Sequence, residues 1–223
     1  MSDSSQTRNP VPRYIAVEGP IGVGKTTLAK RLAQSFNYEV LLEQSEENPF
    51  LDRFYHNPKQ HALATQLFFL FQRAQQMQQL RQDDMFEPVR VADFLMEKDR
   101  LFARQNLDAD EFKLYQNVYD HLTIDAPVPD LVIYLQAPVE VLMQRIQNRG
   151  IASELLIEER YLVNLINAYT DFFHYYDKST LLMVNCSEVD FVNNHEDYEL
   201  LFNHILTMRK GSRNYFNPRP GLL

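Results

Sequence analysis

Residues 18–27 read Glu18-Gly19-Pro20-Ile21-Gly22-Val23-Gly24-Lys25-Thr26-Thr27, and this window holds three of the six glycines of the chain. From Gly19 to Thr26 it follows the pattern Gly-x-x-x-x-Gly-Lys-Thr, which is typical of a loop that wraps around phosphate groups. In such a loop the backbone N–H groups surround the anion, the lysine reaches the β- and γ-phosphates, and the threonine hydroxyl binds Mg²⁺. We therefore expect residues 19–27 to bind a nucleoside triphosphate, with Lys25 on the phosphates and Thr26 on the metal.

The segments on both sides of this loop agree with that prediction. Residues 13–17 read as a short buried strand, and residues 28–36 read as a helix. A helix that starts at a phosphate loop points the positive end of its dipole at the anion. A glycine-rich surface turn that matches the pattern by chance would not need these flanks.

The remainder of the chain alternates between strand and helix patterns. Further strands are predicted at residues 39–43, 88–93, 131–135 and 181–184, and further helices at residues 59–81, 96–105, 109–122, 139–148, 158–176 and 196–208. This alternation predicts an α/β fold of the P-loop NTPase type, with three layers and a five-stranded parallel sheet between helices. We expect one kinase domain over residues 13–208 with a lid around residues 145–157, a flexible N-terminus at 1–12 and a solvated C-terminal tail at 209–223.

The composition of the chain limits the kinds of partner and compartment that we expect for it. The 223 residues are 45% hydrophobic and carry a net charge of −8, which argues against a broad nucleic-acid-binding surface. The single cysteine, Cys186, excludes an intrachain disulfide and suits a reducing compartment. The first twelve residues lack an apolar signal core, and no apolar run is long enough to cross a membrane. We expect a soluble, cytoplasmic protein whose histidines do not form a zinc site.

Two acids mark the ends of predicted strands, Glu43 after the second and Asp93 after the third. The carboxyl ends of parallel strands are where α/β proteins bind ligands. One carboxylate can take a proton from an attacking hydroxyl while the other helps to hold Mg²⁺, as phosphoryl transfer requires. The competing interpretation is a nucleotide-gated switch that binds partners. Its guanine-nucleotide signatures, Asp-x-x-Gly and Asn-Lys-x-Asp, do not occur in the chain.

Two further sets of polar residues stand out. Arg145 and Arg149 lie one helical turn apart before Gly150, where they could close over the transferred phosphate or simply complement the helix dipole. Gln66 and Arg73 share one stripe of the long helix with Phe69, among apolar neighbours. An amide in that place can donate to and accept from a nucleobase edge, although isolated Gln and Arg are usually exposed.

Over nearly its whole length the chain resembles the deoxynucleoside kinases, particularly the bacterial deoxyadenosine/deoxyguanosine kinase branch. The residues that carry the resemblance are residues 18–27, Leu42-Glu43, Asn48-Pro49-Phe50-Leu51, Phe54-Tyr55, Gln66, Arg73, Asp93-Phe94-Leu95, Asp99-Arg100-Leu101-Phe102-Ala103, residues 131–135, and Arg145-Ile146-x-x-Arg149. The resemblance implies transfer of the γ-phosphate of ATP to the 5′-hydroxyl of a deoxynucleoside with Mg²⁺, in a homodimer.

The resemblance also implies roles for residues around the reacting group. The general base of the family falls on Glu43, and its acid after the third strand falls on Asp93. The metal would be held by Thr26 with Asp93 or Glu43. The tyrosine and lid glutamate that bind the sugar 3′-hydroxyl fall on Tyr55 and Glu154.

For the base, the resemblance implies recognition by Gln66 and Arg73 and stacking on Phe102. The acid that partners Arg73 is either Asp99 or Glu97. A carboxylate and a guanidinium beside the base should reject thymine, which has no exocyclic amine. We therefore expect deoxyadenosine or deoxyguanosine to be preferred over thymidine, and this reasoning leaves deoxycytidine open as a substrate. The preferred base and triphosphate donor are not fixed by the sequence.

The chain departs from the family in two places. The acid Asp93 is followed by Phe94-Leu95 instead of the common Arg-Ser, and the lid carries Ile151 in place of its second arginine. Each change removes one arginine that would contact phosphate. The alternative enzyme is a nucleoside-monophosphate kinase of the thymidylate kinase type, which would need further basic groups near the acceptor.

Overall fold

The computed structural model describes residues 11–83, 89–122, 126–191 and 194–218 of the chain. The strands are β1 (Tyr14–Glu18), β2 (Glu39–Leu41), β3 (Arg90–Ala92), β4 (Leu131–Gln136), β5 (Thr180–Asn185) and β6 (Arg213–Phe216). The helices are α1 (Lys25–Phe36), α2 (Leu51–His56), α3 (Pro58–Asp83), α4 (Lys98–Asn106), α5 (Ala109–Leu122), α6 (Val139–Arg149), α7 (Glu159–His174) and α8 (His195–Thr207), with short 3₁₀ turns η1 (Ser45–Glu47) and η3 (Glu154–Leu156).

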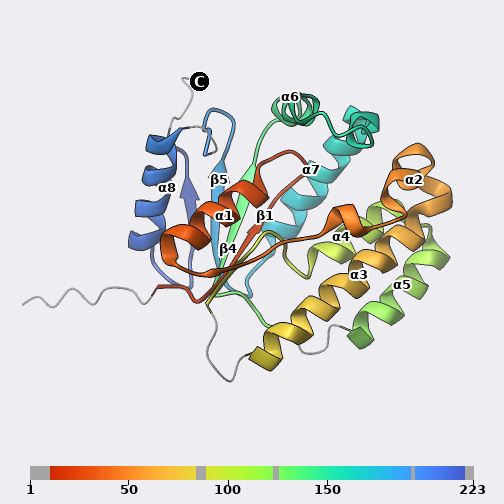
Figure 1. Ribbon diagram of the computed structural model, residues 1–223, viewed down its shortest axis with the longest axis horizontal. Coiled ribbons are helices and arrows are strands. Elements are labelled where there is room, and N and C mark those ends of the chain that lie inside the picture. The colour runs from red at the N-terminus through yellow and green to blue at the C-terminus, as the bar shows by residue number, and fades with distance from the viewer. Residues whose placement is uncertain (1–10, 84–88, 123–125, 192–193, 219–223) are drawn as a thin grey trace, which may run out of the picture.

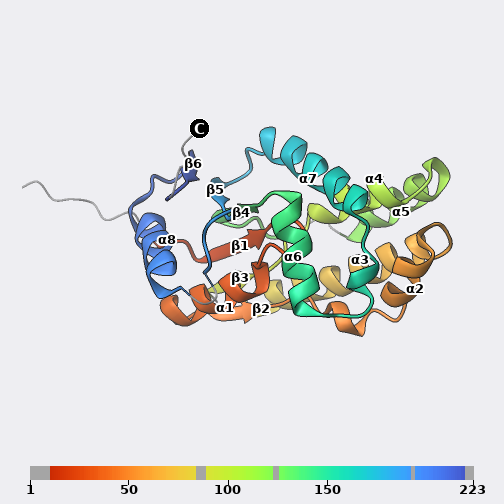
Figure 2. The ribbon, with the colours of Figure 1, turned by 90° about the horizontal axis from the view of Figure 1, so that it is seen from above.

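The strands form one sheet in the order β2-β3-β1-β4-β5-β6, and every pairing between neighbours is parallel (Figure 1). Helices cover both faces. Figures 1 and 2 show α1 and α8 together on one side, while α3, α4, α5 and α7 gather on the other. The predicted three-layer α/β fold is therefore confirmed.

The sheet has six strands, so the prediction of five was wrong. The additional strand β6 lies in the tail that we expected to be solvated. It pairs with β5, and Phe216 is buried against His204. A four-residue strand that carries an arginine and an asparagine has too weak an apolar pattern to be recognised in the sequence. The first ten residues of the expected flexible N-terminus lie outside the described residues.

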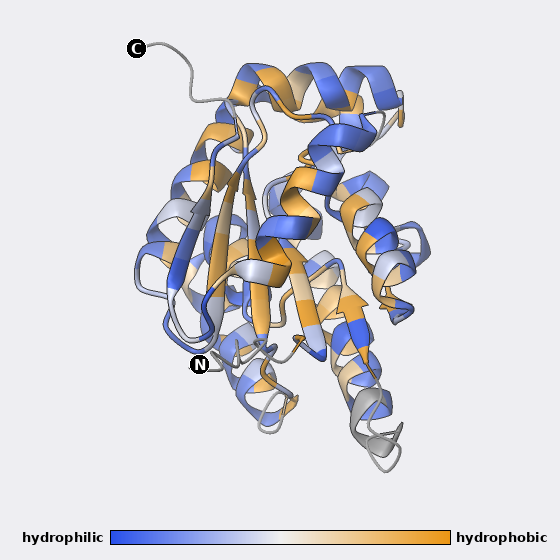
Figure 3. Cartoon of the chain, turned by 90° about the vertical axis from the view of Figure 1, so that its left-hand side faces the viewer, coloured by the Kyte–Doolittle hydropathy of each residue, from blue (hydrophilic) through white to orange (hydrophobic). Residues whose placement is uncertain are grey.

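The core lies along the central strands. Ile15, Ala16 and Val17 of β1 and Leu131, Val132 and Ile133 of β4 are all fully buried. Consecutive buried residues are typical of parallel strands, because helices cover both faces of such a sheet. Figure 3 shows these central strands as mainly hydrophobic, while the surrounding helices carry both hydrophobic and hydrophilic residues. Within the described residues, none of the helices combines the length and apolar character that crossing a bilayer requires.

Candidate active site

The phosphate loop runs from the end of β1 to the start of α1, and two of its glycines are required by close contacts. A Cβ on Gly19 would lie 2.5 Å from the carbonyl oxygen of Leu135, and Gly19 has a φ of 152°. A Cβ on Gly22 would lie 2.9 Å from Cγ1 of Ile146, and its φ of 84° is in the left-handed region. Only glycine adopts these backbone conformations without strain. The loop is thus packed against β4 and α6.

Lys25 begins α1 and folds back over this loop. Its Nζ donates hydrogen bonds to the carbonyl oxygens of Gly19 at 2.8 Å and Pro20 at 3.2 Å. Burial lowers the pKa of Lys25 to about 8, and the positive charge of Lys98 adds to that effect. A poorly solvated cation that is bonded to carbonyl groups gains from a nearby phosphate, as the sequence pattern predicts.

Asp93 links Thr26, the residue whose hydroxyl is expected to bind the metal, to the loop that carries Glu43. Its Oδ2 accepts a hydrogen bond from the Thr26 hydroxyl at 2.5 Å, and its Oδ1 accepts one from the Glu43 backbone N–H at 2.7 Å. Strands β2 and β3 are neighbours and parallel, so both acids leave the same edge of the sheet. The matched placement that the sequence indicated is present.

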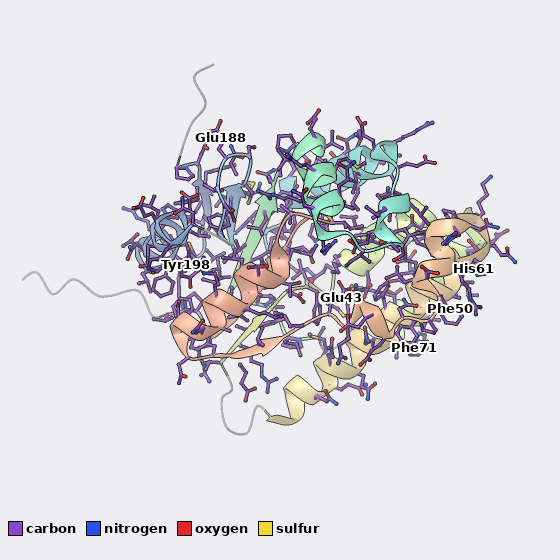
Figure 4. The ribbon with its side chains drawn as sticks, turned by 45° about the horizontal axis from the view of Figure 1, so that its top comes forward. Glu43, Phe50, His61, Phe71, Glu188 and Tyr198 are labelled. Carbon is purple, nitrogen blue, oxygen red and sulfur yellow. The ribbon has the colours of Figure 1, made fainter. Side chains whose placement is uncertain are left out.

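One cavity at this edge brings together most of the predicted residues. It is lined, among others, by Gly22, Lys25, Thr26, Glu43, Tyr55, Gln66, Arg73, Asp93, Phe102, Arg149 and Glu154. Figure 4 shows Glu43 near the middle of the molecule, while Phe71 of α3 lies toward the outside of the molecule. Gln66 and Arg73 are buried, so the alternative that they face solvent is excluded.

Arg73 links two acids inside the cavity. Its Nη2 pairs with Oε1 of Glu43, and its Nη1 donates a hydrogen bond to Oδ1 of Asp99, which is fully buried. The guanidinium also lies 4.9 Å from the ring centre of Phe69 on the same helical stripe. Glu97 instead binds Nζ of Lys178 at 3.0 Å. The acid that partners Arg73 is therefore Asp99. Asp99 is not among the described residues that line the cavity, so its expected contact with the base is not seen in the cavity lining.

Sequence reasoning missed Lys98 and Glu18. Nζ of Lys98 donates a hydrogen bond to Oε2 of Glu43 at 2.9 Å and lies 3.9 Å from Oε2 of Glu18. Glu18 is fully buried and accepts hydrogen bonds from the N–H groups of Gly19 and Leu95 and from the Tyr169 hydroxyl. The sequence does not single out either residue, because a lysine at a helix start and a glutamate at a strand end are ordinarily exposed.

The lid arginines are placed differently from one another. Arg149 pairs with Glu154 across the turn after α6 and lines the cavity that holds Glu43. Arg145 donates hydrogen bonds to the carbonyl oxygens of Val23 at 3.2 Å, Cys186 at 3.0 Å and Val189 at 3.3 Å. The structure does not bring Arg145 into the Glu43 cavity, so the expected pair of clamping arginines is not assembled there.

Arg145 lines a second cavity on the other side of the phosphate loop. This cavity is bounded by residues 22–27, by α6, and by Ser187, Val189, Asp190 and Phe191. Gly22, Lys25, Thr26 and Arg149 border both cavities. Two ligands that occupy the two cavities would therefore meet at the phosphate loop. This arrangement suits transfer of a group from one ligand to the other.

Comparison with known proteins agrees with this geometry. Residues 15–209 match the family described as "Deoxynucleoside kinase". The chain is 37% identical over 200 residues to a deoxyguanosine kinase of Bacillus subtilis, covering 86% of this chain and 95% of the relative. It is 29% identical over 196 residues to a deoxyadenosine kinase of Lactobacillus acidophilus, covering 82% and 89% of the two chains.

Solved structures give the same answer. The deoxyadenosine kinase of M. mycoides with bound dCTP matches with a TM-score of 0.75 and 26% identity, covering 87% of this chain and all of the other. The same enzyme with bound dATP gives a TM-score of 0.75 at 27% identity, covering 86% and 98%. The chain belongs to the deoxynucleoside kinase family, and it is a phosphotransferase that uses an alcohol group as acceptor.

Proposed function

We propose that this kinase transfers the γ-phosphate of ATP to the 5′-hydroxyl of a purine deoxynucleoside, with Glu43 as the general base. The observation that carries the proposal is the cavity in which the Glu43 carboxylate meets the phosphate loop. In the reaction the bond from the 5′-oxygen to the γ-phosphorus forms, and the bond from that phosphorus to the bridging oxygen breaks. The hydroxyl proton passes to Glu43, and the electron pair leaves with ADP.

The donor side is built by residues 19–27. Their backbone N–H groups and Lys25 hold the phosphates, and Arg149 neutralises charge on the transferred group because it borders both cavities. We had expected the same role for Arg145. Its three carbonyl partners support a different proposal, in which Arg145 fixes the phosphate loop and the donor cavity.

The residues present fit a Mg²⁺ ion. Mg²⁺ prefers oxygen ligands and is usually held by one or two protein groups together with substrate phosphates. The Thr26 hydroxyl and the Asp93 carboxylate lie together beside the loop and supply such groups. Glu43 is less suited to the ion, because its carboxylate pairs with Arg73 and Lys98. When bound, the ion would neutralise charge on the phosphates.

The acceptor side supports recognition of a nucleoside. Tyr55, Gln66, Arg73 and Glu154 all line the cavity. This supports the proposal that Tyr55 and Glu154 bind the sugar 3′-hydroxyl and that Gln66 and Arg73 bind the base. Phe102 packs edge-on against Tyr169 with ring centres 6.1 Å apart and borders the cavity, as a stacking residue should. A nucleoside monophosphate is a poorer acceptor, because Arg73 and Lys98 already pair with carboxylates.

A purine preference is supported by the Arg73–Asp99 pair and by the relatives named deoxyguanosine and deoxyadenosine kinases. Arg73 lines the cavity and can donate to an acceptor on the purine edge, while Asp99 holds the guanidinium in place. Incubation with γ-labelled ATP and each of the four deoxynucleosides or their monophosphates tests the proposal. We expect labelled 5′-monophosphates of the purines. A kcat/KM for thymidine that equals or exceeds both purine values would contradict the base assignment.

The assembly and location are also proposals. A homodimer is supported by Phe71 of α3 and Leu114 of α5, two large apolar side chains that are each more than half exposed on helices packed together. A cytoplasmic location is supported by Cys186, which is buried as a free thiol. Light scattering of Phe71→Glu would test the dimer, which we expect to dissociate.

A further inference from the structure

Lys98 is a buried ammonium that the proposed reaction has not used. It is the first residue of α4, only 3% of it is exposed, and it borders the acceptor cavity. An uncompensated lysine in such a place is costly, so its position requires partners. Nζ lies 2.9 Å from Oε2 of Glu43 and 3.9 Å from Oε2 of Glu18.

The two oxygens of Glu43 are treated differently by their neighbours. Oε2 accepts the hydrogen bond from Lys98. Oε1 is paired in charge with Arg73, but among the described residues it accepts no hydrogen bond although it is buried. A base must keep one lone pair free for the proton that it takes. Each carboxylate oxygen has two lone pairs, so Oε1 keeps one for the acceptor hydroxyl although the Arg73 guanidinium lies against it.

We propose that Lys98 is a positioning residue for the general base. It holds Oε2 of Glu43, which turns Oε1 toward the acceptor and keeps the carboxylate ionised until the hydroxyl arrives. The inference rests on the proposed function, since it needs Glu43 to take the proton. When the proton reaches Oε1, Glu43 becomes neutral, and Glu18 remains as a carboxylate close to Lys98.

Charged groups from several elements surround Lys98. Glu18 ends β1, Glu43 follows β2, Asp93 follows β3, Arg73 projects from α3, and Lys25 begins α1. Burial is the main influence and lowers the pKa of Lys98 to about 8, while Glu18 opposes that shift.

Steady-state kinetics of Lys98→Met and Lys98→Arg test the proposal at saturating ATP and deoxynucleoside. Loss of a hydrogen bond between charged groups should lower kcat of Lys98→Met by about 10- to 100-fold. Lys98→Arg should retain kcat within about fivefold at pH 7, because arginine keeps the charge. Lys178→Met is the matched control, since Lys178 pairs with Glu97 at the surface and should keep wild-type kcat.

The split between kcat and KM adds a readout that a merely structural role would not give: Lys98→Met should lose kcat with little change in the KM for ATP. The kcat of Lys98→Arg decides the question if Lys98→Met does not fold.

Comparison with Glu43→Gln separates the proposal about Lys98 from the proposal that Glu43 is the general base. If Lys98 acts through Glu43, the double variant Glu43→Gln/Lys98→Met should be no more than about threefold slower than Glu43→Gln alone. If Glu43→Gln is slow but Lys98→Met keeps kcat within threefold of wild type, only the inference about Lys98 is overturned. A Lys98→Arg enzyme as slow as Lys98→Met would overturn it as well. A fast Glu43→Gln enzyme would instead overturn the assignment of the base.

Discussion

Replacement of Arg73 by methionine removes a buried cation that links the carboxylates of Glu43 and Asp99. The side chain of Arg73 is 6% exposed, and its partners Asp99 and Glu43 are 0% and 17% exposed. Burial lowers the pKa of Arg73 to about 10, so the guanidinium is charged at neutral pH. Removing one partner of a buried ion pair leaves an uncompensated charge, which costs about 3–5 kcal/mol.

This cost predicts a large loss of thermal stability. For a chain of this size, 1 kcal/mol corresponds to about 2–4 °C in Tm, so Arg73→Met should melt about 6–20 °C below wild type at pH 7. Calorimetry without ligands measures the difference. The double variant Arg73→Met/Asp99→Asn should recover part of the loss, because the buried charge of Asp99 is gone. Arg53→Met, at an exposed position of α2, should have a free energy of unfolding within about 0.5 kcal/mol of wild type. A shift below about 2 °C for Arg73→Met would refute the reasoning.

Three further predictions concern the phosphate loop and its cations. Lys25→Ala should weaken ATP binding and lower kcat, whereas Arg149→Ala should act mainly on kcat, because the charge of Arg149 belongs to the lid. Calorimetric titration with ATP separates the two variants, and equal losses of ATP affinity would contradict separate roles. Gly22→Ala should destabilise the protein by about 1–3 kcal/mol in urea unfolding, since its Cβ meets Ile146 and its φ is 84°, and a wild-type unfolding midpoint would count against this packing. Lys25 and Lys98 have folded pKa values of about 8 against 10.5 in the unfolded chain, so the unfolded state binds more protons between these values. Their contribution to the free energy of unfolding should therefore rise from pH 8 toward pH 10, and Lys98→Arg should show a smaller rise than wild type in urea unfolding at several pH values.

The phosphate loop could be predicted because its function depends on backbone shape. Gly19 and Gly22 occupy conformations that other residues avoid, so their identity and spacing are visible in the sequence. The acids Glu43 and Asp93 could be placed because parallel strands end at a common edge. The sequence pattern also indicated Gln66 and Arg73 on one helical stripe. Their burial required the structure, because a polar stripe on a helix is more often exposed.

The remaining features depend on contacts between distant segments. Lys98 reads as an ordinary helix residue, and only the approach of α4 to the end of β2 places it on Glu43. Arg145 and Arg149 look equivalent in sequence, yet Arg145 is held by carbonyl groups from two other segments. Strand β6 forms because β5 offers an unpaired edge, which no local pattern reveals.

The general base can be tested most directly by single-turnover phosphoryl transfer with Glu43→Gln. Glutamine keeps the size of the side chain and removes the charge that accepts the proton. With saturating ATP and a purine deoxynucleoside, we predict a rate about 10²- to 10⁴-fold below wild type and nearly unchanged ATP affinity. Glu46→Gln, an exposed neighbour in η1, should retain the wild-type rate. A loss of less than tenfold in Glu43→Gln would contradict the account and shift the role to Asp93.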